Sequence, residues 1–434
     1  MQNESKLYGV VIGQEHISFV LDDFQCVFIN SHMDTKEWEL IAQTQGFIRG
    51  RTTDGKYVYL HSGQDIRIHR QATLNTWLYF VSHLEGMETF QMISFEGGIL
   101  DKLYFKSMWE TDDKEPMQTR IKHSVDRETY ALTKERLKGK LTVGAGICEG
   151  VSAEKGNYIS ATETRLELSL EEEQRLEQFS ELYGYVVDLC QFMAFRRNIR
   201  FSRIVLEKKS SRYPDFPEEI AECYVRYEEA PMTEKHIYRC ILFQDLGECL
   251  DKLLSSIVDN APQKPRFNIG FLPENDKDVK YVTSMKIREV CSALESEMEL
   301  AKIKVQQEAE FKKLVKELKK VVKAHREGEH PLEDEKSYQY ISGTLDHMVG
   351  ALADRIEECF MEYQPLLGDY ISRKSIDELV KYRNTFTHGN YMQLDGKLAE
   401  TAYVLMKLVY CCVLKRIGME DEQIRGLMER NVVA

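Results

Sequence analysis

Residues 1–165 alternate short apolar runs with turn signals. The runs include LYGVVIG, HISFVLDD, TWLYFVSHL and GGILDKLYF. Short runs rich in Val, Ile, Phe and Tyr between turn residues are typical of β-strands. Asp54-Gly55 lies between two such runs, and an Asp-Gly pair supports the positive φ angles of a hairpin turn. The pattern predicts a β-rich domain built as a sandwich or a curled sheet.

Residues 166–282 mix the two kinds of pattern. LSLEEEQRLEQFSELYGYVVDLCQFMAF has the spacing of an amphipathic helix, with acidic residues in its first turns, where the helix dipole favours them. FRRNIRFSRIVLEKK ends in a strand-like run, and DLGECLDKLLSSIVDN predicts another helix. The proline-containing stretch NAPQKPRFNIGFLPENDKD predicts a loop that ends this mixed α/β connecting region.

Residues 283–434 carry helical spacing nearly throughout. The predicted helices are one long segment from TSMKIREV to KAHREG, then SYQYISGTLDHMVGALADRIEECFMEY, SIDELVKYRNTF and KLAETAYVLMKLVYCCVLKRIG. Ser372 or Ser375 is suited to cap the third helix, and Gly418 to end the fourth. The prediction is a helical bundle. The fold class of the whole chain is therefore α+β, with a β-rich N-terminal domain, a mixed middle region and an all-α C-terminal domain.

Composition fits a soluble globular protein of two or three domains, with 434 residues of which 43% are hydrophobic and 30% charged. Because we find neither a signal peptide nor an apolar run of membrane-spanning length, we expect a cytoplasmic protein without membrane contact. The ten cysteines form no C-x-x-C pair, which predicts buried free thiols. Gly144-Ala145-Gly146 lacks the Lys-Ser/Thr of a phosphate loop. No cofactor or metal is expected.

The net charge of −13 excludes a protein that coats nucleic acid non-specifically, so that any RNA contact must be confined to a local patch. Two segments are candidates for such a patch: the basic cluster Arg196–Arg203, with Arg196, Arg197, Arg200 and Arg203, and the Lys-rich helix 302–326. Each has an ordinary alternative. The first can be a solvated helix end that runs into a strand, and the second a solvated helix face. Both alternatives stay open.

The stretch KYRNTFTHGN, Lys381 to Asn390, carries the strongest chemical signal. Arg383 can bind a phosphate through two parallel hydrogen bonds, and His388 can give or take a proton near neutral pH. Together they offer charge stabilisation and acid–base transfer for cleavage of a phosphodiester. Residues five apart on a regular helix point about 140° apart. We therefore expect the helix to stop near Gly389, with His388 on an irregular last turn.

A purely structural role for the same residues is the alternative. In that case Arg383 forms a salt bridge with an acidic helix neighbour, Asn384 is exposed and His388 caps the helix. In either case Tyr382 and Phe386 are expected to pack in the bundle core.

Arg-Asn-x-x-x-His near the end of an amphipathic helix, within an all-helical C-terminal segment, resembles the Arg-x4-6-His signature of HEPN domains. These are helical domains found in many RNA-cleaving toxins and antiviral proteins. The local sequence RNTFTHG is most similar to the HEPN domain of ApeA-type anti-phage proteins. Upstream, GFIRGRTTDGKYVYL resembles the N-terminal domain of the same proteins. The resemblance divides the chain into a sensor or regulatory domain (1–165), a connecting region (166–282) and a HEPN domain (283–434).

The resemblance implies a metal-independent endoribonuclease effector of anti-phage, abortive-infection defence. His388 would act on the 2′-hydroxyl or the leaving oxygen, Arg383 would hold the scissile phosphate, and Asn384 would orient His388 or the phosphate. Such domains pair so that two motifs line one cleft, which implies a homodimer or a higher homo-oligomer. RNA would be the substrate, and a phage-derived trigger would act on the N-terminal domain. The alternatives are a non-catalytic HEPN module that binds nucleotides or proteins, and a scaffold.

Overall fold

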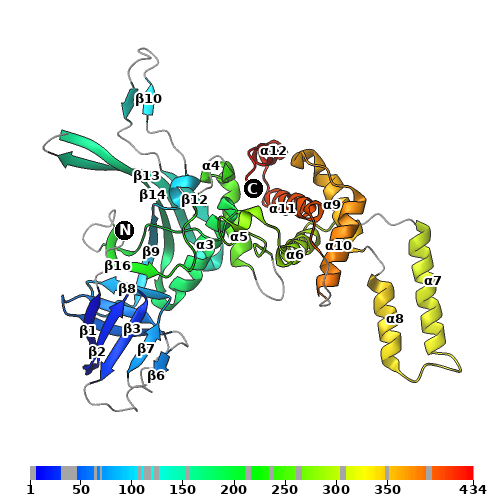
Figure 1. The fold of residues 1–434 in the computed structure, drawn as a ribbon, viewed down its shortest axis with the longest axis horizontal. Helices are drawn as coiled ribbons and strands as arrows, with labels where there is room; N and C mark the ends of the chain where they lie inside the picture. Colours follow the sequence, from blue (N-terminus) through cyan, green and yellow to red (C-terminus); the bar gives the residue numbers. More distant parts are fainter. Residues whose placement is uncertain are drawn as a thin grey trace. The chain divides into compact units, whose positions relative to one another are not determined.

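The chain divides into two compact units in the computed structural model. The first is Met1–Ala194 with Asn198–Val258, and the second is Phe195–Arg197 with Asp259–Ala434. Each is described by itself (Figure 1). The structure describes residues 6–30, 46–62, 66–68, 71–104, 109–111, 119–121, 127–152, 156–210, 217–233, 239–260, 266–303, 309–347, 351–387 and 393–433.

The N-terminal unit is built on an antiparallel sheet. Its strands are β1 (Leu7–Val11), β2 (Gln14–Asp22), β3 (Gln25–Asn30), β4 (Phe47–Thr52), β5 (Tyr57–His61), β6 (Ile66–Ile68), β7 (Ala72–Asn75), β8 (Leu78–Ser82), β9 (Thr89–Glu96), β12 (Glu128–Leu132), β13 (Gly139–Ser152), β14 (Gly156–Arg175), β15 (Arg203–Lys209) and β16 (Pro217–Val225). Within the described residues their order is β12-β13-β14-β9-β15-β16-β8-β5-β4-β1-β2-β3-β7-β6. A separate hairpin joins β10 (Trp109–Thr111) to β11 (Thr119–Ile121).

Helices complete this unit. They are α2 (Leu100–Leu103), η1 (Glu135–Leu137), η2 (Leu176–Gln178), α3 (Phe179–Ala194), α4 (Phe243–Leu246), η4 (Gly247–Cys249) and α5 (Leu250–Val258). Phe179, the first residue of α3, packs edge-on against Phe80 of β8 with ring centroids 5.1 Å apart. This aromatic contact anchors α3 on the sheet.

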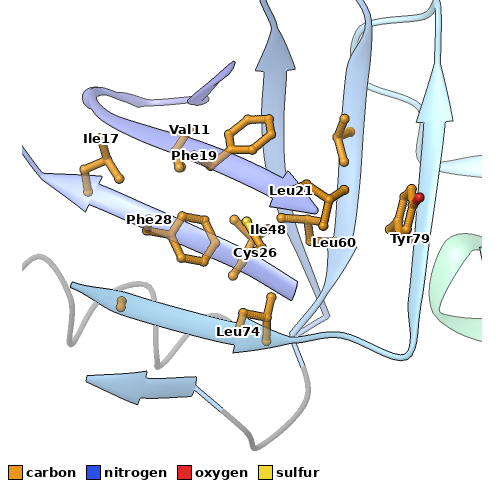
Figure 2. Close-up of a cluster of buried hydrophobic side chains, with 12 residues drawn as sticks. Val11, Ile17, Phe19, Leu21, Cys26, Phe28, Ile48, Leu60, Leu74 and Tyr79 are labelled. Atoms are coloured by element: carbon orange, nitrogen blue, oxygen red, sulfur yellow. The ribbon is translucent and has the colours of Figure 1, made fainter. Parts of the chain in front are cut away.

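One end of the sheet curls around its own core. Figure 2 shows a cluster of buried side chains that come from β1, β2, β3, β4, β5, β7 and β8. These seven strands are consecutive neighbours in the sheet order, and Figure 2 shows them bending around the cluster that they share. The predicted Asp54-Gly55 turn closes β4 and β5, where Gly55 has φ +86 and the Thr52 N–H donates to the Lys56 carbonyl at 2.8 Å. Both the curled sheet and this hairpin are confirmed.

Two glycines make room for the largest ring of this core. A Cβ on Gly9 would lie 2.2 Å from the Arg51 carbonyl oxygen and 2.7 Å from the ring of Phe19, and a Cβ on Gly50 would lie 2.5 Å from the same ring. Because β1 and β4 carry no side chain at these positions, the ring of Phe19 can lie flat on their backbone.

Gly9→Ala is expected to lower the free energy of unfolding by about 1–3 kcal/mol, because a buried side chain is forced into an occupied space. Chemical denaturation measures this loss. Gly184→Ala in α3 is the matched control, since no atom outside the local helix lies within 4 Å of its Cβ position. It should stabilise the protein by about 0.5–1 kcal/mol through helix propensity. Equal stability of Gly9→Ala and wild type would contradict the packing described above.

The predicted helix over 168–195 was wrong in its first part. Residues 168–175 belong to β14, which pairs with β13 on one side and β9 on the other. Leu166, Leu168 and Leu170 are buried, and the residues between them are more exposed. This period of two fits a strand, and the buried Leu row outweighs the helical spacing that the later residues suggested.

The C-terminal unit is helical. It contains η5 (Asp278–Lys280), α6 (Ser284–Leu300), α7 (Ala309–Arg326), α8 (Glu335–His347), α9 (Leu352–Leu367), α10 (Arg373–Thr387), α11 (Gly396–Arg416) and α12 (Asp421–Glu429). Helix α11 lies at the centre of the bundle and contacts α6, α9, α10 and α12 (Figure 1). Its apolar residues from Leu405 to Leu414 are almost all buried, as predicted. The helix ends at Arg416, and Gly418 follows with φ +96.

Two of the predicted helices are each interrupted. The predicted helix from 283 to 328 breaks after α6, where Lys302 takes φ +57 and the Ile303 N–H donates to the Met298 carbonyl at 2.9 Å. This is a helix-ending motif with a lysine in the place that glycine usually takes. The predicted helix from 337 to 363 is divided into α8 and α9. Asp354 accepts a hydrogen bond from the Ala351 N–H at 3.1 Å, which marks a new helix start.

The predicted α+β class is confirmed, with a β-rich N-terminal region and a helical C-terminal region. Apart from residues 195–197, the boundary between the two units lies between Val258 and Asp259. The assignment of separate roles to 1–165, 166–282 and 283–434 stays a prediction. The nine cysteines whose side chains the structure describes are free, and all of them except Cys249 are buried. Within the described residues, none of the helices combines the length and apolar composition that crossing a membrane requires.

Candidate active site

Helix α10 presents the Arg-Asn part of the motif in its last turns. At its start, the Ser375 N–H donates to the Ser372 hydroxyl at 3.2 Å, so Ser372 is the capping residue. At its end, the Thr387 hydroxyl donates to the Arg383 carbonyl at 2.8 Å. Thr387 is the last residue of the helix. His388 lies outside the described residues, and its position off the regular turn stays a prediction.

Two contacts hold the end of α10 against α6. The hydroxyls of Tyr382 and Ser284 lie 2.7 Å apart, and Arg383 Nη2 donates to Glu295 Oε2 at 3.0 Å. Ser284 and Glu295 are separated along α6 by about 16 Å, given a rise of 1.5 Å per residue. Consecutive residues of α10 therefore reach toward α6 at points three turns apart, which fixes the crossing of the two helices.

Arg383 is positioned without using all its hydrogen-bond donors. Besides the bond to Glu295, Nη1 donates to Asn384 Oδ1 at 3.1 Å. Nε is buried and has no hydrogen-bond partner within the described part of the chain. The side chain is 25% exposed, so the guanidinium is held by protein on one side and accessible on the other. A planar guanidinium with unused hydrogen-bond donors is suited to bind a phosphate.

A buried thiol lies beneath this ion pair. Burial raises the pKa of Cys291 to about 12, while Arg383 lowers it and Glu295 raises it. Since Cys291 is fully buried and stays protonated near neutral pH, it takes no part in nucleophilic chemistry. Its role is to pack under Arg383 on the α6 side.

The neighbours of Arg383 divide into a buried and an exposed residue. Tyr382 is 2% exposed and packs in the bundle, as predicted. Phe386 is 37% exposed, so the prediction that it packs in the core was wrong. Asn384 is also exposed. At about 100° per residue, Asn384 falls on the side of α10 opposite to Tyr382. Phe386 falls on the same face as Leu379 and Tyr382, and its exposure shows that the described part of the bundle does not cover the last turn of the helix.

Glu295 is the residue of this site that the motif did not reveal. It lies 88 residues before Arg383 in the chain, on a helix with several other acidic residues. The available signal was weak, because nothing in EVCSALESEMEL distinguishes Glu295 from Glu289, Glu297 or Glu299. Only the crossing of α6 and α10 brings it to the motif.

Two arginines of the first basic cluster form ion pairs within their own units. Arg196 is buried, with Nε 4.0 Å from a carboxylate oxygen of Asp276. Arg203 pairs with Glu219 at 2.7 Å and with two further glutamates. In the Lys-rich helix, Lys313 and Lys323 are mostly exposed and make only long ion pairs along α7. RNA contact by either segment stays a prediction.

The fold and site together define a helical domain that presents an arginine motif at the end of one helix. Residues 284–423 match the family model described as Apea-like HEPN, so the C-terminal unit contains an Apea-like HEPN domain. The matched segment begins with α6, includes the whole of α10 and its motif, and ends within α12. Neither a curated protein nor a solved structure matches the chain. The HEPN family indicates a nuclease-type defence protein.

Proposed function

We propose that the protein is a metal-independent endoribonuclease effector of anti-phage, abortive-infection defence. The observation that carries this proposal is Arg383, which Glu295 holds at the end of α10 with an accessible face and a buried Nε that has no hydrogen-bond partner among the described residues. The Apea-like HEPN match across α6 and α10 supports it. Residues 1–165, within the N-terminal unit, would act as the sensor of a phage-derived trigger.

In the proposed reaction the 2′-hydroxyl of RNA attacks the adjacent phosphorus, and the bond to the 5′-oxygen of the next nucleotide breaks. His388 takes the proton of the 2′-hydroxyl or returns one to the leaving oxygen. Arg383 binds the phosphate and the negative charge that grows on it, and Asn384 orients the reacting groups. The products are a 2′,3′-cyclic phosphate and a 5′-hydroxyl. DNA lacks the attacking hydroxyl and should resist cleavage.

The site is proposed to be complete only when two copies of the motif face one cleft, in a homodimer or a higher homo-oligomer. One Arg383 is already partly neutralised by Glu295, and a single exposed guanidinium gives little charge for a transition state. A second copy would double the positive charge and supply a second proton donor.

Expression in cells tests the function. Wild type and His388→Ala are placed under a tight promoter, and growth and total RNA integrity are followed after induction and after phage challenge. We expect RNA loss and growth arrest with wild type only. The proposal would be overturned if cells that express wild type grow as well as cells that express His388→Ala, and if purified protein leaves RNA intact.

A non-catalytic binding module is the second candidate. The ion pair between Arg383 and Glu295 and the exposure of Asn384 are what a purely structural role of the motif predicts, and a motif with that role would leave the domain without catalysis. One difference is that the acidic partner comes from α6 and not from the arginine's own helix. If the site is catalytic only, Arg383→Ala leaves partner binding untouched. If the site is a binding module, the same change weakens binding of a nucleotide or protein partner.

Glu295 is expected to position Arg383 in the reaction. Glu295→Ala should lower kcat by about 10–100-fold with little change in KM, because a misplaced catalytic group costs rate at this scale. Glu295→Gln keeps an oxygen that accepts from Arg383 Nη2 and should stay within a few-fold of wild type. Steady-state cleavage of a short RNA gives both constants. The positioning role is wrong if both variants lose activity equally, or if neither does.

A further inference from the structure

A cavity of about 270 Å³ lies in the N-terminal unit, whereas the Arg-Asn motif belongs to the C-terminal unit. Three segments that are distant in sequence form it: the turn after β9, the segment before β15 and residues 231–232. The Ile99 N–H donates to the Arg200 carbonyl at 2.9 Å, and the Met232 N–H donates to the Asn198 carbonyl at 3.0 Å. Backbone hydrogen bonds therefore build its frame.

The turn after β9 comes unusually close to the segment before β15. Gly97 and Gly98 have φ +59 and +64. A Cβ on Gly98 would lie 2.2 Å from the Arg200 carbonyl oxygen, so only glycine fits there. Glycines at a close backbone approach are a common way to shape a binding site.

Apolar side chains cover most of the cavity wall. Ile99, Phe201 and Met232 line it and are 4%, 4% and 8% exposed. Because these side chains are buried, the packing of the N-terminal unit shapes this wall. Such walls are suited to the apolar part of a small ligand.

Two cationic side chains line the same cavity, Arg200 and Lys102. The guanidinium carbon of Arg200 lies 4.7 Å from the ring centroid of Tyr227, which orients the group by a cation–π contact. Its Nε is buried without a hydrogen-bond partner, and no carboxylate pairs with it within the described residues. Lys102 Nζ donates to the Thr233 carbonyl over a long 3.4 Å.

Arg200 therefore differs from its neighbour Arg203, whose charge is balanced by glutamates. An unbalanced guanidinium beside an apolar wall favours a ligand that carries the missing negative charge.

We propose that this cavity binds a small organic anion. Its carboxylate or phosphate would lie at Arg200 with Lys102 nearby, and its apolar body against Ile99, Phe201 and Met232. Size supports one substituted ring, since a cavity of about 150 Å³ already takes benzene. This ligand would give the N-terminal unit, which contains the predicted sensor domain, a chemical signal, and the proposal does not depend on ribonuclease activity.

Titration calorimetry of the full chain tests the proposal, with phenyl phosphate and benzoate as anionic probes and benzyl alcohol as the neutral probe. We expect at least one anion to bind with a Kd of millimolar or tighter, and the neutral probe to bind at least tenfold more weakly. Arg200→Met should weaken the anion at least tenfold. Arg51→Met is the matched control, because Arg51 also lies over a tyrosine ring, Tyr57, outside the cavity.

Met232→Trp provides a second variant that leaves both charges in place. It should fill the cavity and abolish binding of the anion, while an unchanged thermal midpoint and circular dichroism spectrum establish that each variant is folded. The proposal is overturned if neither anion binds wild type at 10 mM, or if the neutral probe binds equally well. It is also overturned if folded Arg200→Met and Met232→Trp both retain wild-type affinity.

Discussion

Arg383→Ala is expected to lower the rate of RNA cleavage by about 100–1,000-fold, the usual cost of removing one group that stabilises transition-state charge. The loss should appear in kcat, because the guanidinium binds the charge that grows during the reaction. Arg383→Lys keeps a charge but not the planar fork of donors, and its rate should lie between those of Arg383→Ala and wild type. Single-turnover cleavage of a labelled RNA measures all three.

Lys374→Ala is the control for this series. Lys374 lies on the same helix, is 80% exposed, and makes only a long 3.9 Å ion pair with Glu378. Its removal tests whether any loss of positive charge from α10 slows cleavage. Wild-type rates in Arg383→Ala, or an equal loss in Lys374→Ala, would show that Arg383 has no specific role in the reaction.

The largest expected effect on stability comes from Arg416→Met. Arg416 at the end of α11 donates from Nε and Nη2 to the two carboxylate oxygens of Glu297 on α6, both at 2.8 Å. Glu297 is 3% exposed. Removing the arginine leaves a buried carboxylate without its partner, which costs about 3–5 kcal/mol. Denaturant unfolding of the C-terminal unit should report this loss.

Two comparisons separate the buried pair from a simple loss of charge. Lys415→Met removes the neighbouring cation, whose ion pair with Asp421 is 42% and 59% exposed, and should cost at most about 1 kcal/mol. In the double variant Arg416→Met, Glu297→Leu no charge is left buried, so stability should return toward wild type. An equal loss in the single and double variants would contradict the role given to the buried charge.

The pH dependence of the Arg416→Met effect has a definite sign. Burial raises the pKa of Glu297, and Arg416 lowers it, so the pKa rises further when the arginine is removed. The folded state then binds a proton more readily than the unfolded state. Stability of the variant should therefore fall as the pH rises from the ordinary glutamate pKa through the raised value, and acidification should relieve part of the penalty.

Local signals in the sequence predicted much of the fold. The Asp54-Gly55 turn, the central apolar helix α11 and the end of that helix near Gly418 each depend on a few neighbouring residues. Errors arose where a tertiary contact outweighs the local pattern. Residues 168–175 form a strand because β9 and β13 pair with it on both sides. Lys302 ends α6 in a left-handed conformation that few lysines adopt.

Only the part of the candidate site that lies within one segment of the sequence was predictable. Arg383 and Asn384 lie in KYRNTFTHGN and were found there, whereas Glu295 comes from another helix far away in the chain. The exposure of Phe386 was missed because its spacing places it on the face of Leu379 and Tyr382, and the sequence does not show how far the bundle covers the last turn of α10. The cavity at Arg200 could not be predicted, since the contacts that distinguish Arg200 from Arg203 come from distant strands and turns.

The most direct test of the central claim is to map the RNA ends that the purified protein produces. Total RNA is incubated with wild type and with His388→Ala, each with and without a chelator of divalent metals. The account predicts cleavage by wild type alone, unchanged by the chelator, with 2′,3′-cyclic phosphate and 5′-hydroxyl ends. Intact RNA in every reaction, cleavage that His388→Ala retains, or 5′-phosphate ends that disappear with the chelator would contradict it.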